Sequence, residues 1–209
     1  MSTNPYIIGI TGGSASGKTS FLLELKNTFS ADEVCVVSQD NYYKPIHEQE
    51  ADSNGMVNYD LPSCIDVDRF LIDIQNLKNG ESITKTEYVF NNPNKVPETI
   101  VVNPAPIIIV EGLFIYYFEQ IAEQLQLKIF VDADEELKWQ RRLQRDTSER
   151  GIGSDIVKYQ WDNHVKPAYE QYLLPYRNHS DIIITNNTNY HKGLQIMQNH
   201  IRQILNNEC

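Results

Sequence analysis

Gly12-Gly13-Ser14-Ala15-Ser16-Gly17-Lys18-Thr19 is the stretch that decides the fold. It matches the pattern GxxxxGK[ST] and lies between an apolar, β-branched run, Tyr6 to Ile10, and an amphipathic stretch, Lys18 to Phe29. This order predicts a strand, a glycine-rich loop and a helix. In such a loop the backbone N–H groups point inward and the helix adds its positive dipole end, so the segment predicts a phosphate-binding site.

The loop predicts a nucleoside triphosphate, ATP or GTP, together with Mg²⁺. Lys18 is placed to reach the terminal phosphates, and the Thr19 hydroxyl is placed to ligate the metal. The residues expected to bind the nucleotide are Gly12, Gly13, Ser14, Ala15, Ser16, Gly17, Lys18, Thr19 and Ser20. The loop alone does not separate a kinase from a GTPase or an ATPase, because all three share it.

Further short apolar runs, each bounded by polar residues, are typical of buried strands. They are Val34 to Val37, Ile107 to Val110, Leu127 to Val131 and Ile182 to Thr185. Helical patterns lie between them, at Asp66 to Leu77, Tyr116 to Gln124, Asp134 to Glu149, Asp155 to Tyr176 and Tyr190 to Asn206. This alternation predicts an α/β fold with a five-stranded parallel sheet and helices on both faces.

Two features depart from simple alternation. Segments Ser82 to Phe90 and Thr99 to Val102 flank a turn-rich stretch and predict a small β-hairpin insertion near residues 81–102. Pro167 and Pro175 are expected to divide the long helical stretch Asp155 to Tyr176 into two or three shorter helices. With 209 residues, the whole chain, 1–209, is expected to form a single domain.

Composition excludes several classes of protein. The formal net charge of −10 would repel polyphosphate backbones, so nucleic-acid binding is not expected. No run approaches the roughly 18 apolar residues of a membrane span, and residues Met1 to Tyr6 lack a secretion signal. We therefore expect a cytoplasmic protein without membrane contact. The three cysteines have unrelated spacings and fit neither a disulfide framework nor a zinc site.

Two carboxylates follow predicted strands. Asp40 falls at the carboxyl edge of the sheet, where it either accepts a proton from a substrate hydroxyl or caps a turn, and its position favours neither. Glu111 follows the run Ile107 to Val110 and precedes a glycine. Because phosphoryl transfer needs a carboxylate near the metal, we expect Glu111 to help hold Mg²⁺.

Arginines concentrate in one segment of this acidic chain, at positions 141, 142, 145 and 150. Guanidinium groups neutralise charge on a transferring phosphoryl group, so the cluster predicts a helical lid near residues 141–160. The alternative is a surface helix whose arginines form salt bridges. Its expected acidic partners are Asp134, Glu135, Glu136 and Glu149.

Several motifs, in order, resemble the uridine kinase (uridine-cytidine kinase) family of P-loop kinases over nearly the full chain. They are the loop 12–19, Ser38-Gln39-Asp40-Asn41-Tyr42-Tyr43, Asn58-Tyr59-Asp60-Leu61-Pro62, Glu111-Gly112, Phe130-Val131-Asp132, Arg141 to Gly151, and Val165-Lys166-Pro167-Ala168-Tyr169. The resemblance implies a P-loop NTPase fold and transfer of the γ-phosphoryl of ATP or GTP to the 5′-hydroxyl of uridine or cytidine. The products would be UMP or CMP, as in pyrimidine salvage. It also implies a homotetramer.

The resemblance assigns roles by position. It implies that Asp40 is the base for the 5′-hydroxyl and that Asp60 binds the ribose hydroxyls. The implied catalytic residues are Lys18, Asp40, Arg142, Arg145 and Arg150. The implied substrate-binding residues are Asp40, Tyr43, Tyr59, Asp60, Tyr88, Phe90, Arg142 and Gln160. Thr19 and Glu111 are the implied metal ligands.

The chain departs from the family at two places. Family members resembling it carry a histidine and an arginine after Tyr-x-Phe, whereas Tyr88-Val89-Phe90 precedes Asn91-Asn92-Pro93-Asn94-Lys95 here. Asn91, Asn92 or Asn94 would then have to read the base. Ile152 stands where the family commonly has a further lid arginine.

Three other functions are compatible with a phosphate-binding loop. A related P-loop kinase that acts on another small alcohol, a sugar phosphate or pantothenate, would share the same nucleotide-binding half. A non-catalytic homologue that binds nucleoside as a regulator is disfavoured, because Lys18, Asp40 and Glu111 are all present. A nucleotide-dependent switch is disfavoured too, because Asn94-Lys95 continues as Val96-Pro97 and so lacks the guanine-binding Asn-Lys-x-Asp pattern.

Overall fold

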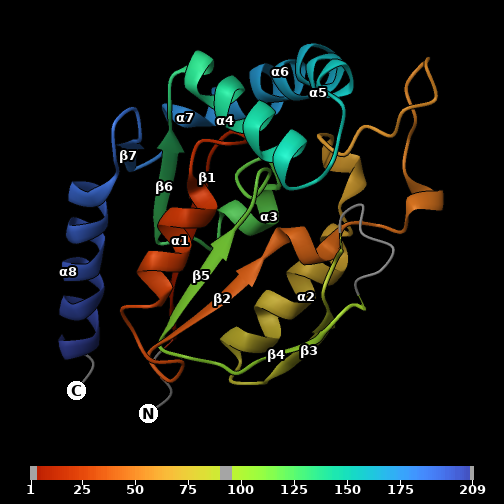
Figure 1. Cartoon of the computed structure of the whole chain (residues 1–209). Coiled ribbons are helices and arrows are strands. Elements are labelled where there is room, and N and C mark those ends of the chain that lie inside the picture. Colours follow the sequence, from red (N-terminus) through yellow and green to blue (C-terminus); the bar gives the residue numbers. More distant parts are fainter. Residues whose placement is uncertain (1–3, 90–95, 208–209) are drawn as a thin grey trace.

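The protein, here as a computed structural model, is described over residues 4–89 and 96–207 (Figure 1). The strands are β1 (Tyr6–Thr11), β2 (Val34–Ser38), β3 (Ile83–Thr86), β4 (Thr99–Val102), β5 (Ile107–Glu111), β6 (Leu127–Asp132) and β7 (Ile182–Thr185). The α-helices are α1 (Lys18–Lys26), α2 (Val67–Lys78), α3 (Glu119–Ala122), α4 (Glu135–Ser148), α5 (Ser154–Gln160), α6 (Lys166–Ala168), α7 (Leu174–Arg177) and α8 (His191–Asn207). Within these ranges, no helix combines the length and the apolar character needed to span a membrane.

Five parallel strands form the main sheet, in the order β2-β5-β1-β6-β7, which confirms the predicted α/β fold. β1 lies between β5 and β6, with Ile8 opposite Ile109 on one side and Leu127 on the other. All of β5 is buried. A strand that is covered on both faces exposes no side chain to solvent, so its residues are apolar without alternation.

Alternate residues of the strands pack into two hydrophobic clusters, one on each face of the sheet. Ile8, Ile107 and Ile109 pack against α1 and α8, whereas Ile7 and Ile108 pack against α2 and the segment after β5. Figure 1 shows α1 and α8 together on one side and α2 on the other. The prediction of helices on both faces is confirmed.

The predicted hairpin is present as the antiparallel pair β3-β4, with Ile83 opposite Val102. Side chains alternate along β3, so that Ile83 and Lys85 are buried and Thr84 and Thr86 are exposed. Residues 90–95, which lie between β3 and β4 in the sequence, are outside the described residues.

Two helical predictions differ from the structure. Only Glu119–Ala122 of the predicted helix Tyr116 to Gln124 is helical, because the Tyr116 hydroxyl is bound into the sheet and donates to the carbonyls of Gly9 and Ile129. The prolines at 167 and 175 do not end the long helical stretch. Each follows a π-helical turn, Trp161–Val165 or Tyr169–Leu173, so the chain stays helical from Ser154 to Arg177.

Lys85 carries an ammonium group into the apolar face of the hairpin. Its side chain is 3% exposed overall, and Nζ makes no hydrogen bond within the described part of the chain. Nζ lies 4.8 Å from the centre of the Tyr42 ring. Burial lowers the pKa of Lys85 to about 8, and the negative charge of Asp73 opposes this only in part. The buried charge therefore costs stability.

We expect Lys85→Met to raise the free energy of unfolding by at least about 1 kcal/mol at pH 7, because Met keeps the aliphatic stem and removes the buried charge. The folded pKa of about 8 lies below the unfolded value of 10.5, so the unfolded chain binds more protons between these pH values. Wild-type stability measured relative to Lys85→Met should therefore rise with pH across this window. Urea unfolding at several pH values tests this, with exposed Lys26→Met as control; a Lys85→Met protein less stable than wild type at pH 7 contradicts it.

Candidate active site

The phosphate-binding loop spans residues 12–17, between the end of β1 at Thr11 and the start of α1 at Lys18. Two of its glycines are required by close neighbours. A Cβ on Gly12 would collide with the carbonyl oxygen of Val131. Gly17 has φ 97°, and a Cβ there would collide with the Asn186 amide, which donates to the Ser16 carbonyl at 2.9 Å. The loop is thus closely packed against the ends of β6 and β7.

The loop opens into a cavity of about 610 Å³. Most of the predicted site residues line it, although they come from distant parts of the sequence. These are Gly13, Ser14, Ala15, Gly17, Lys18, Thr19, Ser20, Asp40, Tyr43, Tyr59, Asp60, Arg142, Arg145, Arg150 and Gln160. Gly12 and Ser16 belong to the same loop, Glu111 contacts Lys18, and the Tyr88 ring contacts the Tyr43 ring at a tilt of 41°. Phe90 lies outside the described residues.

A network of polar contacts joins Lys18 to the carboxyl ends of β2 and β5. The Lys18 ammonium donates to Glu111 Oε2 at 2.5 Å, and the Ser38 hydroxyl donates to Glu111 Oε1 at 2.6 Å. The Ser38 hydroxyl oxygen also lies 3.3 Å from the backbone N of Asp40, which donates to it. Burial lowers the pKa of Lys18, but the carboxylates of Glu111 and Asp40 more than offset it, so the pKa is raised and Lys18 stays charged.

Asp40 lines the cavity, and the pKa of its carboxyl group is raised. Burial raises the pKa of its carboxyl group, and the charge of Glu111 raises it further, while Lys18 and two arginines oppose the shift only partly. A carboxylate with a raised pKa accepts a hydroxyl proton more readily than an ordinary aspartate. Its side of the cavity carries Tyr43, whose hydroxyl donates to the Tyr59 carbonyl at 3.2 Å. Tyr43 lies 5.2 Å, centre to centre, from the Tyr88 ring.

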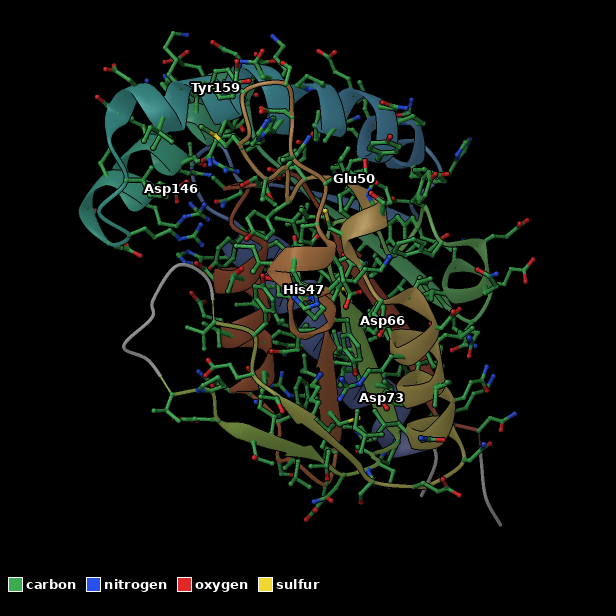
Figure 2. All side chains as sticks on the ribbon, turned by 90° about the vertical axis from the view of Figure 1, so that its right-hand side faces the viewer. His47, Glu50, Asp66, Asp73, Asp146 and Tyr159 are labelled. Carbon is green, nitrogen blue, oxygen red and sulfur yellow. The ribbon has the colours of Figure 1, made fainter. Side chains whose placement is uncertain are left out.

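In the segment 141–160, for which a lid was predicted, three of the four arginines pair with one acid, Asp146, which Figure 2 labels. Its side chain is 1% exposed, and its oxygens lie 3.1 Å from Arg142 Nε, 2.8 Å from Arg145 Nε and 3.3 Å from Arg150 Nη1. Arg142 also donates to the Ser14 hydroxyl at 3.0 Å and lies 3.9 Å from Asp60. Three guanidinium groups on one carboxylate leave a net positive charge facing the phosphate-binding loop.

These arginines pair with an acid that was not among the partners expected from the sequence. Asp134, Glu135, Glu136 and Glu149 were expected, but Asp146 pairs with all three. The i,i+4 spacing of Arg142 and Asp146 was the signal that could have found it. His164 was also missed as a cavity residue: it is buried and lines the wall together with Gln160.

The residues present fit a magnesium ion held partly by the protein. In the described ranges, no three His, Cys, Asp or Glu side chains cluster so as to hold a metal on their own. The donors would be a hydroxyl, from Thr19, and a carboxylate, from Glu111, and Mg²⁺ prefers such oxygens. A site with few protein ligands suits Mg²⁺, because this ion commonly takes its other ligands from water and substrate phosphates.

The parallel sheet, the loop after β1 and the cavity above it define a P-loop nucleotide-binding protein of the α/β class. Residues 7–190 match the family described as "Phosphoribulokinase / Uridine kinase family". The chain is 37% identical to the uridine kinase of Brevibacillus brevis, with 97% of this chain and 94% of that protein covered. It is 32% identical to uridine-cytidine kinase B of Dictyostelium discoideum, with 96% and 82% covered. The chain belongs to the phosphoribulokinase/uridine kinase family.

Solved structures share the fold at low sequence identity. A possible uridine kinase from Bacillus stearothermophilus has a TM-score of 0.60 at 17% identity, with 87% of this chain and 89% of that chain covered. Phosphoribulokinase from Rhodobacter spheroides has a TM-score of 0.61 at 15% identity, with 89% and 73% covered. These likenesses support the predicted P-loop kinase fold. Membership of this kinase family also makes a nucleotide the phosphoryl donor of the chain.

We expect Asp146→Asn to lower the free energy of unfolding by about 3 kcal/mol, because three arginines lose the buried carboxylate that they share. Asp162→Asn is the control, since its pair with Lys158 is also an i,i+4 pair but exposed, and it should lose less than about 1 kcal/mol. Urea unfolding of both variants measures the difference. An equal decrease in the free energy of unfolding in the two variants would contradict a stabilising role of the buried Asp146 carboxylate.

Proposed function

We propose that the protein is a nucleoside kinase that transfers the γ-phosphoryl group of ATP or GTP to the 5′-hydroxyl of uridine or cytidine. The observation that carries the proposal is the shared cavity, in which the phosphate-binding loop with Lys18 faces Asp40 and Asp60 across a single space. Similarity over nearly the whole chain to proteins named uridine kinase and uridine-cytidine kinase supports the pyrimidine nucleoside as acceptor. Phosphoryl transfer depends mainly on such positioning of donor and acceptor.

The acceptor half of the mechanism centres on Asp40. The 5′-hydroxyl gives its proton to the Asp40 carboxylate as its oxygen bonds to the γ-phosphorus, and the bond to the bridging oxygen of the donor breaks to release the nucleoside diphosphate. The raised pKa of Asp40 supports this role. Asp60 would bind the ribose hydroxyls, and Tyr43, Tyr59 and Gln160 would line the nucleoside pocket.

The donor half depends on charge. Backbone N–H groups of the loop and the Lys18 ammonium would hold the phosphates, and Arg142, Arg145 and Arg150 would offset the charge that develops on the moving phosphoryl group. Thr19 and Glu111 would hold Mg²⁺, which neutralises phosphate charge when it is bound. Glu111 has a second part in this half, since it keeps Lys18 charged.

The finer features of the proposal stay predictions. Base reading by Asn91, Asn92 or Asn94 concerns residues outside the described ranges. Ile152 lines the cavity, so the lid has an apolar group where the family commonly has a cation. The homotetramer and the cytoplasmic location likewise remain predictions from the sequence.

The direct test is acceptor-dependent release of nucleoside diphosphate from Mg·ATP and Mg·GTP. Separate reactions would contain uridine, cytidine, purine nucleosides, pantothenate or sugar phosphates, with an acceptor-free blank. We expect uridine or cytidine to drive release well above the blank. Release driven only by pantothenate or a sugar phosphate would contradict the nucleoside as acceptor while leaving the donor half intact.

We expect Asp40→Asn to lower kcat by about 10²- to 10⁴-fold, because the acceptor hydroxyl loses its base. Because the pKa of Asp40 is raised, wild-type kcat should decrease as the pH is lowered, with a midpoint above the ordinary aspartate pKa of about 3.9. Asp40→Asn should lack this fall. Steady-state kinetics of both proteins from pH 4.5 to 8 measure the loss of kcat and its pH dependence. Near-normal turnover by Asp40→Asn would exclude Asp40 as the base.

A further inference from the structure

Asp52 connects the loop that precedes Tyr59 and Asp60 to the helical segment that contains Tyr159 and His164. Asp52 lies between Tyr43 and Tyr59 in the sequence, and its Oδ2 lies 2.7 Å from both the Tyr159 hydroxyl and His164 Nε2. The Asn54 side-chain amide also donates to the Tyr159 hydroxyl at 2.7 Å. Figure 2 shows the loop with Glu50 rising to the helix with Tyr159. Asp52, Tyr159 and His164 are called the loop clasp below.

The loop side of the clasp is a compact turn. Asp52 Oδ1 accepts hydrogen bonds from the backbone N–H groups of Asn54 and Met56, at 2.8 and 3.0 Å. The backbone of Asp52 pairs with that of Met56, and Ala51 forms an isolated β-bridge with Val57. Because residues 51–57 are bonded to one another, fixing Asp52 fixes the whole turn. Val57, at its end, lines the active-site cavity.

The helix side of the clasp depends on the π-helical turn Trp161–Val165. In an α-helix, neighbours on one face are three or four residues apart, but Tyr159 and His164 are five apart. Hydrogen bonds from i to i+5 wind the π turn more widely and bring the two side chains to the same acid. Their rings lie 5.7 Å apart, edge to face. The His164 side chain is 3% exposed and the Asp52 side chain 19%, so their contact is partly buried.

Both sides of the clasp continue directly into the cavity wall. Tyr59 and Asp60 follow the turn, and Gln160 lies between Tyr159 and His164 on the helix. Arg142 lies 3.9 Å from Asp60, so the loop meets the helical layer at a second point, inside the cavity. The clasp thus holds together the two segments that face each other across the proposed acceptor pocket.

We propose that Asp52, Tyr159 and His164 are positioning residues for the acceptor: they fix residues 51–60 against the helix of Gln160 and so shape the nucleoside pocket. The inference rests on the proposed function for the identity of the acceptor. Loss of the clasp should then weaken acceptor binding specifically, because the loop residues 12–20, which hold the nucleotide, make no part of it.

The test uses Asp52→Asn, His164→Ala and the double variant, with Tyr159→Phe as a mild change that removes only one hydroxyl. We expect each of the first two to raise KM for the acceptor by about 10-fold and the double variant to be no worse than either, since residues in one network are not additive. KM for the nucleotide should change by less than about 2-fold. Asp162→Asn, on the same helix and exposed, is the matched control.

Amide hydrogen exchange of residues 50–60 supplies a readout that does not need the reaction. We expect faster exchange there in Asp52→Asn and His164→Ala, with α1 unchanged, and normal exchange in Asp162→Asn. Unchanged exchange and unchanged acceptor KM would overturn the proposal. A parallel rise in both KM values, with faster exchange throughout the chain, would also overturn it, because it would show a general structural role.

Failure of the proposed function gives a different result. If the wild-type protein phosphorylates another alcohol, KM is measured for that alcohol. The clasp variants should then still raise this KM without raising KM for the nucleotide. If no acceptor is used, exchange decides: faster exchange confined to residues 50–60 supports the clasp as a structural coupling, whereas unchanged exchange overturns it.

Discussion

Lys18 carries a positive charge into a buried position at the start of α1, and the active site is arranged around the pair that it forms with Glu111. A lone buried ammonium group would lose its proton or weaken the fold, whereas a charged partner at hydrogen-bond distance keeps it protonated. That partner stands at the end of β5, next to β1 in the sheet. The pair therefore requires the strand order, since β5 has to lie beside the strand that leads into the phosphate-binding loop.

A comparison with Lys85 shows what the partner does. Both lysines are buried, but Lys85 lies over an aromatic ring without a carboxylate at hydrogen-bond distance among the described residues, and its pKa falls to about 8. The pKa of Lys18 rises instead. The two cases differ in the carboxylate contact rather than in burial. Such a fixed cation suits a site that binds polyphosphate in a chain with net charge −10.

Local patterns were sufficient to predict the framework. The apolar β-branched runs ending at Ile10, Val37 and Val110 became buried strands, because nothing polar interrupts them and both faces of the sheet are covered. The Gly-rich motif placed the loop because a tight turn between strand and helix requires those glycines. Pro167 was read as a helix break, which is the usual local effect, but π turns with wider hydrogen bonding accommodate it.

Contacts between distant segments account for what the sequence did not predict. Asp52 and His164 are 112 positions apart, and no spacing rule connects them. The π turn that brings Tyr159 and His164 together has no clear sequence signal, so the sequence did not place His164 at the site. The pairing of Asp146 is different, because its i,i+4 spacing from Arg142 is visible in the sequence.

In the proposed reaction, the cavity positions a nucleoside 5′-hydroxyl against a phosphoryl donor held by the loop and Lys18. Phosphorus NMR of the product formed from uridine and Mg·ATP tests it most directly. The account predicts a single new phosphomonoester coupled to the two 5′-methylene protons, with ADP in equal amount. Inorganic phosphate with ADP and no ester, or an ester at the 2′ or 3′ position, would contradict it.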